Sequence, residues 1–537
     1  MPEGRLLWLR VLIFHGYLLG GTGSNVYNAR LASALVGLGH EVHLLCQDRH
    51  PESHRFVDAA GDWDSGSLRV RVLRGREGEG EHARCTIYRP DIGSLLPVYV
   101  DDRYEGMQAR TFAQCSDQEV ARYIDANVAA VREVVARTRP DIALANHLVM
   151  GPVILARALE GEVPYAVKVH GSALEYTVKP NPERFLEPAR EGLAGAGAIL
   201  VGSHHTAASL WQALGDPSVE RRTRLGPPGV DVERFVPHGP ARAREGLRAL
   251  RARLRAAAGD GDGDAEVATT SLAGSAGEDP SGENAFARDD LAAASALDRL
   301  DPEHDRLVGF VGKLIVNKGV DLLLAAWPLV LERIPQAKLV VVGFGADREL
   351  LERLLEALTA GDLGQAEGIA LPHLLAFLRS LHGAAREHYL DAARALGERV
   401  VFTGRLDHEE LAELLPVCEA LVVPSTFPEA FGMVAAEAAA CGALPISAAH
   451  SGLAEVSAAL ARAVPEEVAP WLSFGVDDLA VRALAERIVA WLGVDPVLRE
   501  QTRMGLVATV RERWSWEGVA RGVIAAALGE LDTLATP

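Results

Sequence analysis

Two glutamates, Glu429 and Glu437, are spaced so that both could bind hydroxyl groups of one ligand. Glu429 lies in a turn after the apolar run 421–424, and Glu437 lies inside an alanine-rich helix that Gly442 ends. The apolar run is typical of a buried parallel strand. The first N–H groups of the helix have no acceptor inside it, and with the helix dipole they favour a phosphate. These groups are expected at Phe431, Gly432, Met433 and Val434. The segment predicts an anion site between two acids, which suits a nucleotide diphosphate sugar.

A purely structural role is a better explanation for Glu429 than for Glu437. Glu429 alone is readily interpreted as a solvated loop carboxylate. Glu437 has apolar neighbours on nearly all sides, from Val434 to Cys441, which predicts that its side chain is buried. Because buried carboxylates need partners, Glu437 is the stronger functional candidate.

Two lysines, Lys313 and Lys318, flank a loop between the apolar strand predicted over 307–311 and the helix predicted over 320–331. Two cations at the end of a strand suit a pyrophosphate, because they stabilise negative charge that builds on a departing phosphate. Lysines are also common on surfaces, and the spacing alone does not decide between the two interpretations.

A glycine-rich loop near the N-terminus could hold another part of a ligand. The pattern of strand 10–19, loop, helix 25–38 and strand 42–46 predicts a βαβ unit. Glycines let the backbone approach a ligand closely. The loop is not a full dinucleotide fingerprint, because Val26 stands where a third glycine is needed, and a plain tight turn is an equally good interpretation. The glycines concerned are Gly20, Gly21 and Gly23.

Two histidines follow predicted buried strands. His147 comes after the strand over 141–146, and His170 comes after the strand over 165–169. Ligands of open parallel sheets gather at the carboxyl ends of strands. A single histidine is more often structural than functional, but His170 directly caps its strand and precedes a glycine, so it is the better candidate.

The spacing of Glu429 and Glu437 resembles the Glu-x7-Glu signature of the retaining family 4 glycosyltransferases, also called glycosyl transferases group 1. Pro428, Phe431, Gly432 and Gly442 fit the same pattern. The resemblance implies an α/β protein of GT-B fold, with two Rossmann-like doubly wound parallel-sheet domains facing across a cleft.

The resemblance also implies roles for individual residues. The expected catalytic residues are His170, Lys313, Lys318 and Glu429, with Lys313 standing where the family usually has an arginine. Glu437 would bind ribose hydroxyls, and Glu429 and His170 would contact the hexose. Further expected donor-binding residues are Gly345, in the loop after the strand over 338–342, and Arg405 and Leu406, where the family holds the nucleobase edge. The loop of Gly20, Gly21 and Gly23 is similar to the family's glycine loop.

The expected division of the chain follows from a segment around Pro228 that resembles the family's domain crossover. Residues 1–225 are predicted to form an acceptor domain, with the C-terminal helix 515–537 packing back on it. Residues 226–514 are predicted to form the nucleotide-sugar domain. Within the latter, residues 256–287 are rich in Gly, Asp, Ser and Ala and are predicted to be a disordered insertion.

Composition limits the classes of function. The net charge of −19 over 537 residues argues against nucleic acid or anionic membranes as partners. The five cysteines are scattered, without the spacing of a zinc site or a disulfide framework. The first apolar run is interpreted as a strand and not a signal peptide, and no run is long enough for a transmembrane helix. A cytoplasmic location is therefore expected.

We expect a retaining, metal-independent hexosyltransferase that uses no cofactor besides its nucleotide diphosphate sugar donor. The expected acceptor is a hydroxyl of a sugar, a small polar molecule or a glycolipid. Two alternatives stay open, a sugar-nucleotide epimerase of GT-B fold and a non-catalytic sugar-nucleotide-binding protein. The sequence does not predict the nucleobase, the hexose, the acceptor or the oligomeric state.

Overall fold

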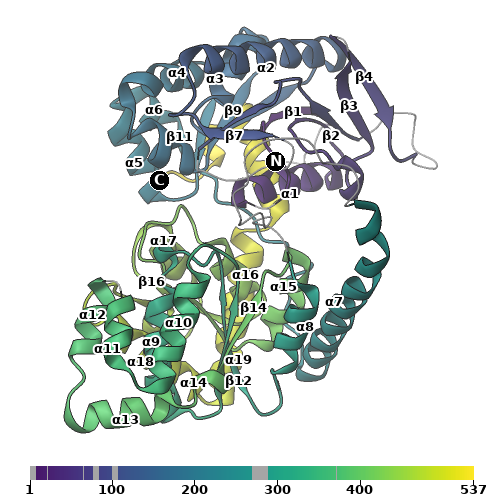
Figure 1. Ribbon diagram of the computed structural model, residues 1–537. Coiled ribbons are helices and arrows are strands. Elements are labelled where there is room, and N and C mark those ends of the chain that lie inside the picture. The colour runs from purple at the N-terminus through teal and green to yellow at the C-terminus, as the bar shows by residue number, and fades with distance from the viewer. Residues whose placement is uncertain are drawn as a thin grey trace. The chain divides into compact units, whose positions relative to one another are not determined.

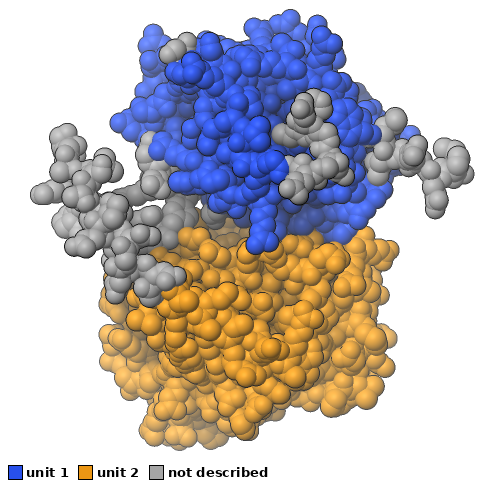
Figure 2. Space-filling model, turned by 90° about the vertical axis from the view of Figure 1, so that its right-hand side faces the viewer, with its two compact units in different colours: residues 1–229, 514–537 blue, residues 230–513 orange. Residues whose placement is uncertain are grey.

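The chain forms two compact units. The structure, a computed structural model, describes residues 8–20, 22–64, 66–75, 84–99, 107–268, 288–370 and 372–537. The first unit comprises Met1–Gly229 and Trp514–Pro537, and the second comprises Val230–Arg513 (Figure 2). The division expected from the sequence, after residue 225, lies a few residues before this boundary.

The first unit is built on a nine-stranded sheet in the order β11-β10-β9-β8-β1-β2-β5-β3-β4 (Figure 1). All neighbouring strands pair in parallel except β3 and β4. The strands are β1 (Arg10–Phe14), β2 (Glu41–Leu45), β3 (Ala59–Asp64), β4 (Ser67–Val72), β5 (Cys85–Arg89), β8 (Ile142–Asn146), β9 (Tyr165–Val169), β10 (Ala198–Val201) and β11 (Thr223–Leu225). Two short strands, β6 (Leu95–Val98) and β7 (Gln108–Thr111), form a separate sheet.

The strand predicted over residues 10–19 is too long. β1 ends at Phe14, because the N–H groups of His15 and Gly16 both donate to the carbonyl of Leu45, at 3.0 and 3.1 Å, and so end the ladder with β2. The residues that follow form a loop at the carboxyl ends of the strands, where the ring of His15 lies 2.9 Å from Asn25 Oδ1 and 3.0 Å from Asn28 Nδ2.

Side chains alternate across the sheet of the first unit and enter two hydrophobic cores. Leu12 and Phe14 belong to one core, and Val11 and Ile13 belong to the other. Helices cover both faces: α1 (Gly23–Gly37), α2 (Asp117–Thr138), α3 (Gly151–Leu159), α4 (Pro182–Ala194), α5 (His204–Leu214), α6 (Pro217–Arg222) and α20 (Trp516–Ala527), with short turns η1 (Pro51–Ser53), η2 (Leu174–Val178) and η6 (Leu531–Thr533).

Helix α20 comes from the far end of the chain and packs beside α1. It contributes buried side chains to the core that contains Val11 and Ile13, namely Trp516, Ala520, Val523, Ile524, Ala526 and Ala527. The indole of Trp516 lies so close to Gly229 that a Cβ there would be 2.6 Å from it. The last helix is therefore an integral part of the first unit.

The second unit contains a six-stranded parallel sheet in the order β14-β13-β12-β15-β16-β17. The strands are β12 (Arg306–Val311), β13 (Ala337–Val342), β14 (Val400–Gly404), β15 (Ala420–Val423), β16 (Leu444–Ala448) and β17 (Ser473–Phe474). The strand order reverses between β12 and β15. Ligands of open parallel sheets bind outside the carboxyl ends of strands at such a switch point.

The helices of the second unit begin with a long one, α7. They are α7 (Pro240–Ala268), α8 (Asp290–Asp298), α9 (Val320–Arg333), α10 (Arg348–Ala360), α11 (Leu363–Ile369), α12 (Pro372–Arg379), α13 (Gly383–Ala393), α14 (Leu396–Arg399), α15 (His408–Leu414), α16 (Met433–Ala440), α17 (Ser451–Ala461), α18 (Ala480–Leu492) and α19 (Pro496–Arg513), with η3 (Val316–Lys318), η4 (Leu415–Val417) and η5 (Ala469–Leu472).

Residues 256–287, predicted to be a disordered insertion, begin within helix α7. Helix α7 continues through Ala268, because extending a helix that has already formed costs less than starting one. Residues 269–287 lie outside the described residues. Leu247, Leu250 and Leu254 are buried, and α7 packs on α8.

In the part of the chain that the structure describes, no helix has both the length and the apolar character needed to cross a membrane.

Candidate active site

The loop that carries Lys313 and Lys318, called the lysine loop below, follows β12, and the turn that carries Glu429 follows β15. Because β12 and β15 are adjacent parallel strands, the loop and the turn meet at their carboxyl ends. Gly319, which ends η3, has φ +64°, and a Cβ there would lie 2.0 Å from the carbonyl oxygen of Pro424. Only glycine allows the two loops to come this close. As a result Lys318 Nζ reaches Glu429 Oε1, and the two side chains form an ion pair.

Glu429 is held by a small hydrogen-bond network. Besides the contact with Lys318, its Oε1 accepts from Ser425 Oγ at 2.7 Å, and its N–H donates to Ser451 Oγ at 2.9 Å. His450 Nε2 donates to the carbonyl of Ser425 at 2.8 Å, and His450 Nδ1 lies 3.0 Å from Ser451 Oγ. The carboxylate at the loop therefore has a fixed position and a cation beside it.

Glu437 is buried, as its apolar neighbours predicted, and its side chain is only 4% exposed. Its Oε1 accepts a hydrogen bond from His408 Nε2 at 2.7 Å. The His408 ring packs edge-on against Phe235, with ring centroids 4.8 Å apart. His408 is the first residue of α15, so one carboxylate oxygen of Glu437 is fixed by a neighbouring helix.

Between the two glutamates lies the N-terminus of α16. Gly432 is the N-cap, and its carbonyl accepts from the N–H groups of Ala435 and Ala436 at 3.1 and 3.3 Å. The N–H groups before these have no acceptor inside the helix and point out of its end. The predicted anion-binding residues lie at this end, namely Phe431, Gly432, Met433 and Val434.

Lys313 and Gly345 lie on neighbouring loops after β12 and β13. Lys313 is exposed. A Cβ at Gly345 would lie 2.4 Å from the carbonyl oxygen of Leu314, and the N–H of Leu314 donates to the carbonyl of Phe344 at 2.7 Å. Packing of the two loops is thus sufficient to require a glycine at 345, and the donor contact that the family resemblance implies for Gly345 stays a prediction.

Arg405 and Leu406 connect β14 to α15. Arg405 Nη2 donates to Asp407 Oδ1 at 2.7 Å, and Leu406 is buried. Asp407 forms a capping box with Glu410 at the start of α15. These residues thereby fix the end of the helix that carries His408.

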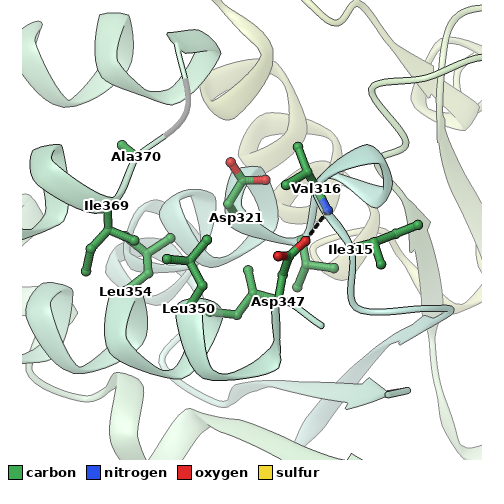
Figure 3. Close-up of a pocket in the computed structure, with 10 residues that line it drawn as sticks. Ile315, Val316, Asp321, Asp347, Leu350, Leu354, Ile369 and Ala370 are labelled. Atoms are coloured by element: carbon green, nitrogen blue, oxygen red, sulfur yellow. Dashed lines mark hydrogen bonds between the residues drawn. The ribbon is translucent and has the colours of Figure 1, made fainter. Parts of the chain in front are cut away.

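An apolar pocket lies beside the lysine loop (Figure 3). Aliphatic side chains of η3, α10 and α11 line it, with Asp321 and Asp347 at its edge. Asp347 Oδ2 accepts from the N–H of Val316 at 2.6 Å and so ties η3 to the start of α10. Among the described residues that line this pocket, the charged ones are Asp321 and Asp347, so the pocket does not suit a diphosphate. Its contacts instead support the loop that carries Lys318.

The other predicted residues belong to the first unit. Gly23 is the first residue of α1, and the carbonyl of Gly20 accepts from Asn25 Nδ2 at 2.6 Å. Gly21 lies outside the described residues. His170 follows β9, and its Nε2 lies 2.8 Å from Asn146 Oδ1 at the end of the adjacent strand β8.

Three imidazoles gather at the carboxyl ends of β1, β8 and β9. The rings of His147 and His170 have centroids 4.9 Å apart, and those of His15 and His147 are 5.8 Å apart. Tyr27 packs edge-on against His170 at 5.0 Å. The ammonium group of Lys168 lies 5.5 Å from the centroid of the Tyr27 ring.

Burial keeps this histidine cluster uncharged. It lowers the pKa of His15 from 6.5 to about 4. Burial, followed by repulsion from neighbouring histidines, holds the pKa values of His147 and His170 well below their usual value. Burial also lowers the pKa of Lys168 to about 7.

This cluster should make the first unit sensitive to acid. Below pH 6.5 the unfolded chain binds a proton on His15 that the folded chain does not bind until about pH 4, so the free energy of unfolding falls as pH falls across this window. At pH 5 the loss through His15 alone is about 2 kcal/mol, at about 1.4 kcal/mol per pH unit.

Urea unfolding at pH 7.5 and 5.0 measures this loss in free energy of unfolding. His15→Asn should lose less stability between the two pH values than the parent, whereas His50→Asn, at a 72% exposed side chain, should match the parent. Equal losses in all three proteins would contradict the assignment.

The structure brings Lys318 and Glu429 into contact and leaves Glu437 on the helix that the same turn begins. Sequence reasoning missed His408, His450 and Ser451, which hold the two glutamates. His408 and Glu437 are 29 residues apart, and no local sequence pattern indicates that they form a hydrogen bond. Among the described residues, no group of three or more His, Cys, Asp or Glu side chains is arranged to hold a metal ion.

Three family models match this chain. A glycosyl transferase 4-like domain matches residues 22–229, and two models of glycosyl transferases group 1 match residues 305–364 and 381–464. Together they cover about two thirds of the chain and fall on both units. The chain belongs to the group 1 glycosyl transferases. The resemblance based on Glu429 and Glu437 is thereby confirmed.

Several curated proteins are similar to this glycosyl transferase. A D-inositol 3-phosphate glycosyltransferase from Frankia alni is 24% identical over 483 residues, which is 87% of this chain and 95% of that protein. Its counterpart from Segniliparus rotundus is 31% identical, over 45% of this chain and 43% of that protein. An uncharacterized glycosyltransferase from Methanocaldococcus jannaschii is 26% identical over 41% of this chain. The last match spans only 44% of the relative's length.

Solved structures similar to this glycosyl transferase show its fold. A sucrose-phosphate synthase from Thermosynechococcus elongatus aligns with a TM-score of 0.54 and 20% identity, over 98% of each chain. The Anabaena protein HepE, in complex with UDP and glucose, aligns with a TM-score of 0.52 and 15% identity, over 97% of this chain and 100% of that one. The α/β fold with two parallel-sheet units is thus the GT-B fold that the sequence predicted.

Proposed function

We propose that this group 1 glycosyl transferase moves a hexosyl group from a nucleotide diphosphate sugar to an acceptor hydroxyl, with retention at the anomeric carbon and without a metal ion. The observation that carries the proposal is the contact of Lys318 with Glu429 at the strand-order switch point of the second unit. A cation, a fixed carboxylate and a helix N-terminus there converge on one strand–turn–helix segment.

The diphosphate is the part of the donor that this segment suits best. The N-terminal N–H groups of α16 and the ammonium group of Lys318 supply fixed positive charge, and Lys313 lies on the same loop. Charge that develops on the departing diphosphate is stabilised most by groups that are already in place. These groups therefore take the role that a metal cation has in other phosphate sites.

The two glutamates suit the two ends of the donor. Glu437 is rigid, because His408 holds one of its oxygens, and a fixed carboxylate selects a ligand with correctly placed hydroxyls such as a ribose. In this structure the carboxylate of Glu429 forms an ion pair with Lys318. When the diphosphate attracts Lys318, Glu429 becomes available to the hexose hydroxyls.

Relatives indicate which donors and acceptors to try first. HepE is solved with UDP and glucose, and the Frankia alni relative is named for inositol 3-phosphate. We propose a UDP- or GDP-hexose as donor and a polyhydroxylated acceptor, and His170 of the first unit as a contact of the hexose.

The test is a transfer assay in EDTA. UDP-glucose and GDP-mannose are screened first by thermal stabilisation, because a ligand at 100 times its Kd stabilises the folded protein by about 2.7 kcal/mol. The stabilising donor is then incubated with inositol 3-phosphate, and NMR follows release of the nucleoside diphosphate and the anomeric configuration of the product.

An α-linked product from an α-linked donor, formed in EDTA, is the expected result. An inverted product would refute retention, and activity restored only by a divalent cation would refute metal independence. Interconversion of the sugar nucleotide without acceptor would identify an epimerase. Binding with neither transfer nor slow donor hydrolysis would identify a sugar-nucleotide-binding protein.

A further inference from the structure

A pocket of about 400 Å³ lies in the first unit, at the carboxyl ends of β2, β3 and β5. Trp63, the next-to-last residue of β3, is part of its wall, and we call it the Trp63 pocket. Gln47 and Arg49 after β2, and residues 89–93 from the end of β5 onward, form most of the remaining described wall. Ligands of open parallel sheets gather at this edge, and the volume falls within the range of small-molecule sites, roughly 300–1,000 Å³.

The Trp63 pocket adjoins the stretch that leads from β1 to the glycine-rich loop. The N–H of Gln47 donates to the carbonyl of Tyr17 at 2.8 Å, and the N–H of Leu19 donates to Asp48 Oδ2 at 3.1 Å. Because β1 and β2 are adjacent parallel strands, the pocket and the loop are neighbours at the same edge of the sheet.

Three apolar side chains of the pocket wall are held from behind. Trp63, Ile92 and Met107 are partly buried and pack against the core that contains Leu12 and Phe14. The indole of Trp63 is also fixed by its Nε1, which donates to Glu133 Oε2 at 2.8 Å. The wall therefore includes a rigid aromatic surface, which suits the C–H groups on the face of a sugar ring.

Gln47 supplies a hydrogen-bond acceptor of fixed orientation. Its side chain is buried, and its Nε2 donates to the carbonyl of Pro90 at 2.9 Å. Since a carbonyl only accepts, this contact determines which end of the amide is nitrogen. Among the described residues, no hydrogen bond to the amide oxygen is found, so this oxygen can accept from a ligand.

An ion pair supplies donors and acceptors side by side. Asp62 and Arg89 stand opposite each other on β3 and β5, and Arg89 Nη2 lies 2.7 Å from Asp62 Oδ1. Their side chains are 35% and 36% exposed, so both keep hydrogen-bonding capacity toward the pocket. A hydroxyl group both donates and accepts, and vicinal hydroxyls can use both partners of such a pair.

The charges of the Trp63 pocket balance. Among the described residues that line it, the charged ones are two arginines and two aspartates, namely Arg49, Arg89, Asp62 and Asp91. A phosphate would compete with Asp62 for Arg89 and would meet like charge on both aspartates. The lining therefore suits a neutral molecule with several hydroxyls better than an anion.

We propose that the Trp63 pocket binds an uncharged saccharide, with a sugar ring against the indole of Trp63 and hydroxyls on Gln47, Asp62 and Arg89. That this saccharide belongs to the acceptor rests on the function proposed above. The acceptor then presents a neutral sugar to this pocket.

Binding is tested by saturation-transfer NMR of the full chain without donor. The probes are maltose, cellobiose and lactose, and glucose 6-phosphate is the anionic comparison. We expect saturation transfer to at least one disaccharide and a weaker effect on glucose 6-phosphate. No transfer to any of the three disaccharides, or tighter binding of glucose 6-phosphate, would overturn the proposal.

Two substitutions test the location of the site. Trp63→Leu should weaken binding of the disaccharide at least about tenfold in Kd, because aromatic anchors carry a large share of binding energy. Trp211→Leu is the matched control and should bind like the parent, since Trp211 also packs partly buried on the same core and also donates from Nε1, to Thr223. Equal Kd values in the two variants would place the saccharide elsewhere and refute the assignment.

Arg89→Met gives a second variant that leaves the hydrophobic core intact. It removes the guanidinium and should weaken binding about tenfold, the usual effect of losing a hydrogen bond to a charged group. Arg157→Met is its control, because Arg157 forms a similarly exposed pair with Glu191 outside the pocket. Unchanged binding in Arg89→Met would contradict the proposed contact.

The transfer assay separates this inference from the proposed function. With the bound disaccharide as acceptor, Trp63→Leu should raise KM for the acceptor about tenfold and leave KM for the donor unchanged. If the parent binds the disaccharide but does not glycosylate it, the saccharide site stands and its role as acceptor site falls. If the parent glycosylates inositol 3-phosphate but binds no disaccharide, the proposed function stands and this inference falls.

Discussion

Replacing Lys318 with alanine should reduce kcat by about 10²–10³-fold, with a smaller effect on KM for the donor. Loss of one fixed group that stabilises developing negative charge has an effect of this size. The substitution removes the cation beside Glu429, but Ser425 still donates to that carboxylate. Single-turnover measurements with a saturating donor separate the chemical step from product release.

The fold should survive this substitution. The Lys318 and Glu429 side chains are 29% and 25% exposed, and ion pairs with this much solvent contact contribute at most about 1 kcal/mol. Lys179→Ala is the matched control, because it removes a comparably exposed pair with Glu175. It should leave kcat unchanged. A Lys318→Ala protein with nearly normal kcat would rule out the proposed site.

Replacing Glu437 with glutamine should raise KM for the donor by about 10–100-fold and change kcat less. A hydrogen bond to a charged group contributes about 1.5–3 kcal/mol, and every 1.4 kcal/mol is a factor of ten. A ribose lies away from the reacting carbon, so its contacts act on the bound donor and the transition state alike. Initial rates over a range of donor concentrations measure both constants.

Glutamine is the informative substitution at this position. Its amide oxygen can still accept from His408, and its volume fills the buried site, so folding should be preserved. Alanine would leave His408 without this partner and open a cavity. Glu466→Gln, at an exposed position, is the control. Unchanged KM in Glu437→Gln, with normal melting temperature, would remove Glu437 from the donor site.

The sequence predicted the strand–turn–helix segment well because each signal there is local. The apolar run before Ser425 forms the buried strand β15, and Gly442 follows the end of α16. Continuous apolar runs indicate parallel strands buried on both faces, which is why the fold could be expected. The burial of Glu437 could also be predicted locally, because its neighbours along the helix are apolar.

The sequence could not predict contacts between segments that are distant along the chain. Asn28 on α1 and Asn146 at the end of β8 are 118 residues apart, and their hydrogen bond forms because β8 pairs with β1, the strand that precedes α1. Gly345 shows another limit: the family resemblance implies a donor contact there, and the close approach of Leu314 is a second reason for the glycine that the sequence does not reveal. A short local pattern cannot distinguish a backbone that approaches a ligand from one that approaches another loop.

The position of α20 has a consequence for biosynthesis. The core of the first unit that begins with Val11 is closed by side chains from residues 516–527. A nascent chain that has left the ribosome up to residue 229 thus presents an unfinished apolar face. The second unit must be translated in full before this face is covered, so the order of synthesis and the order of final folding differ in this protein.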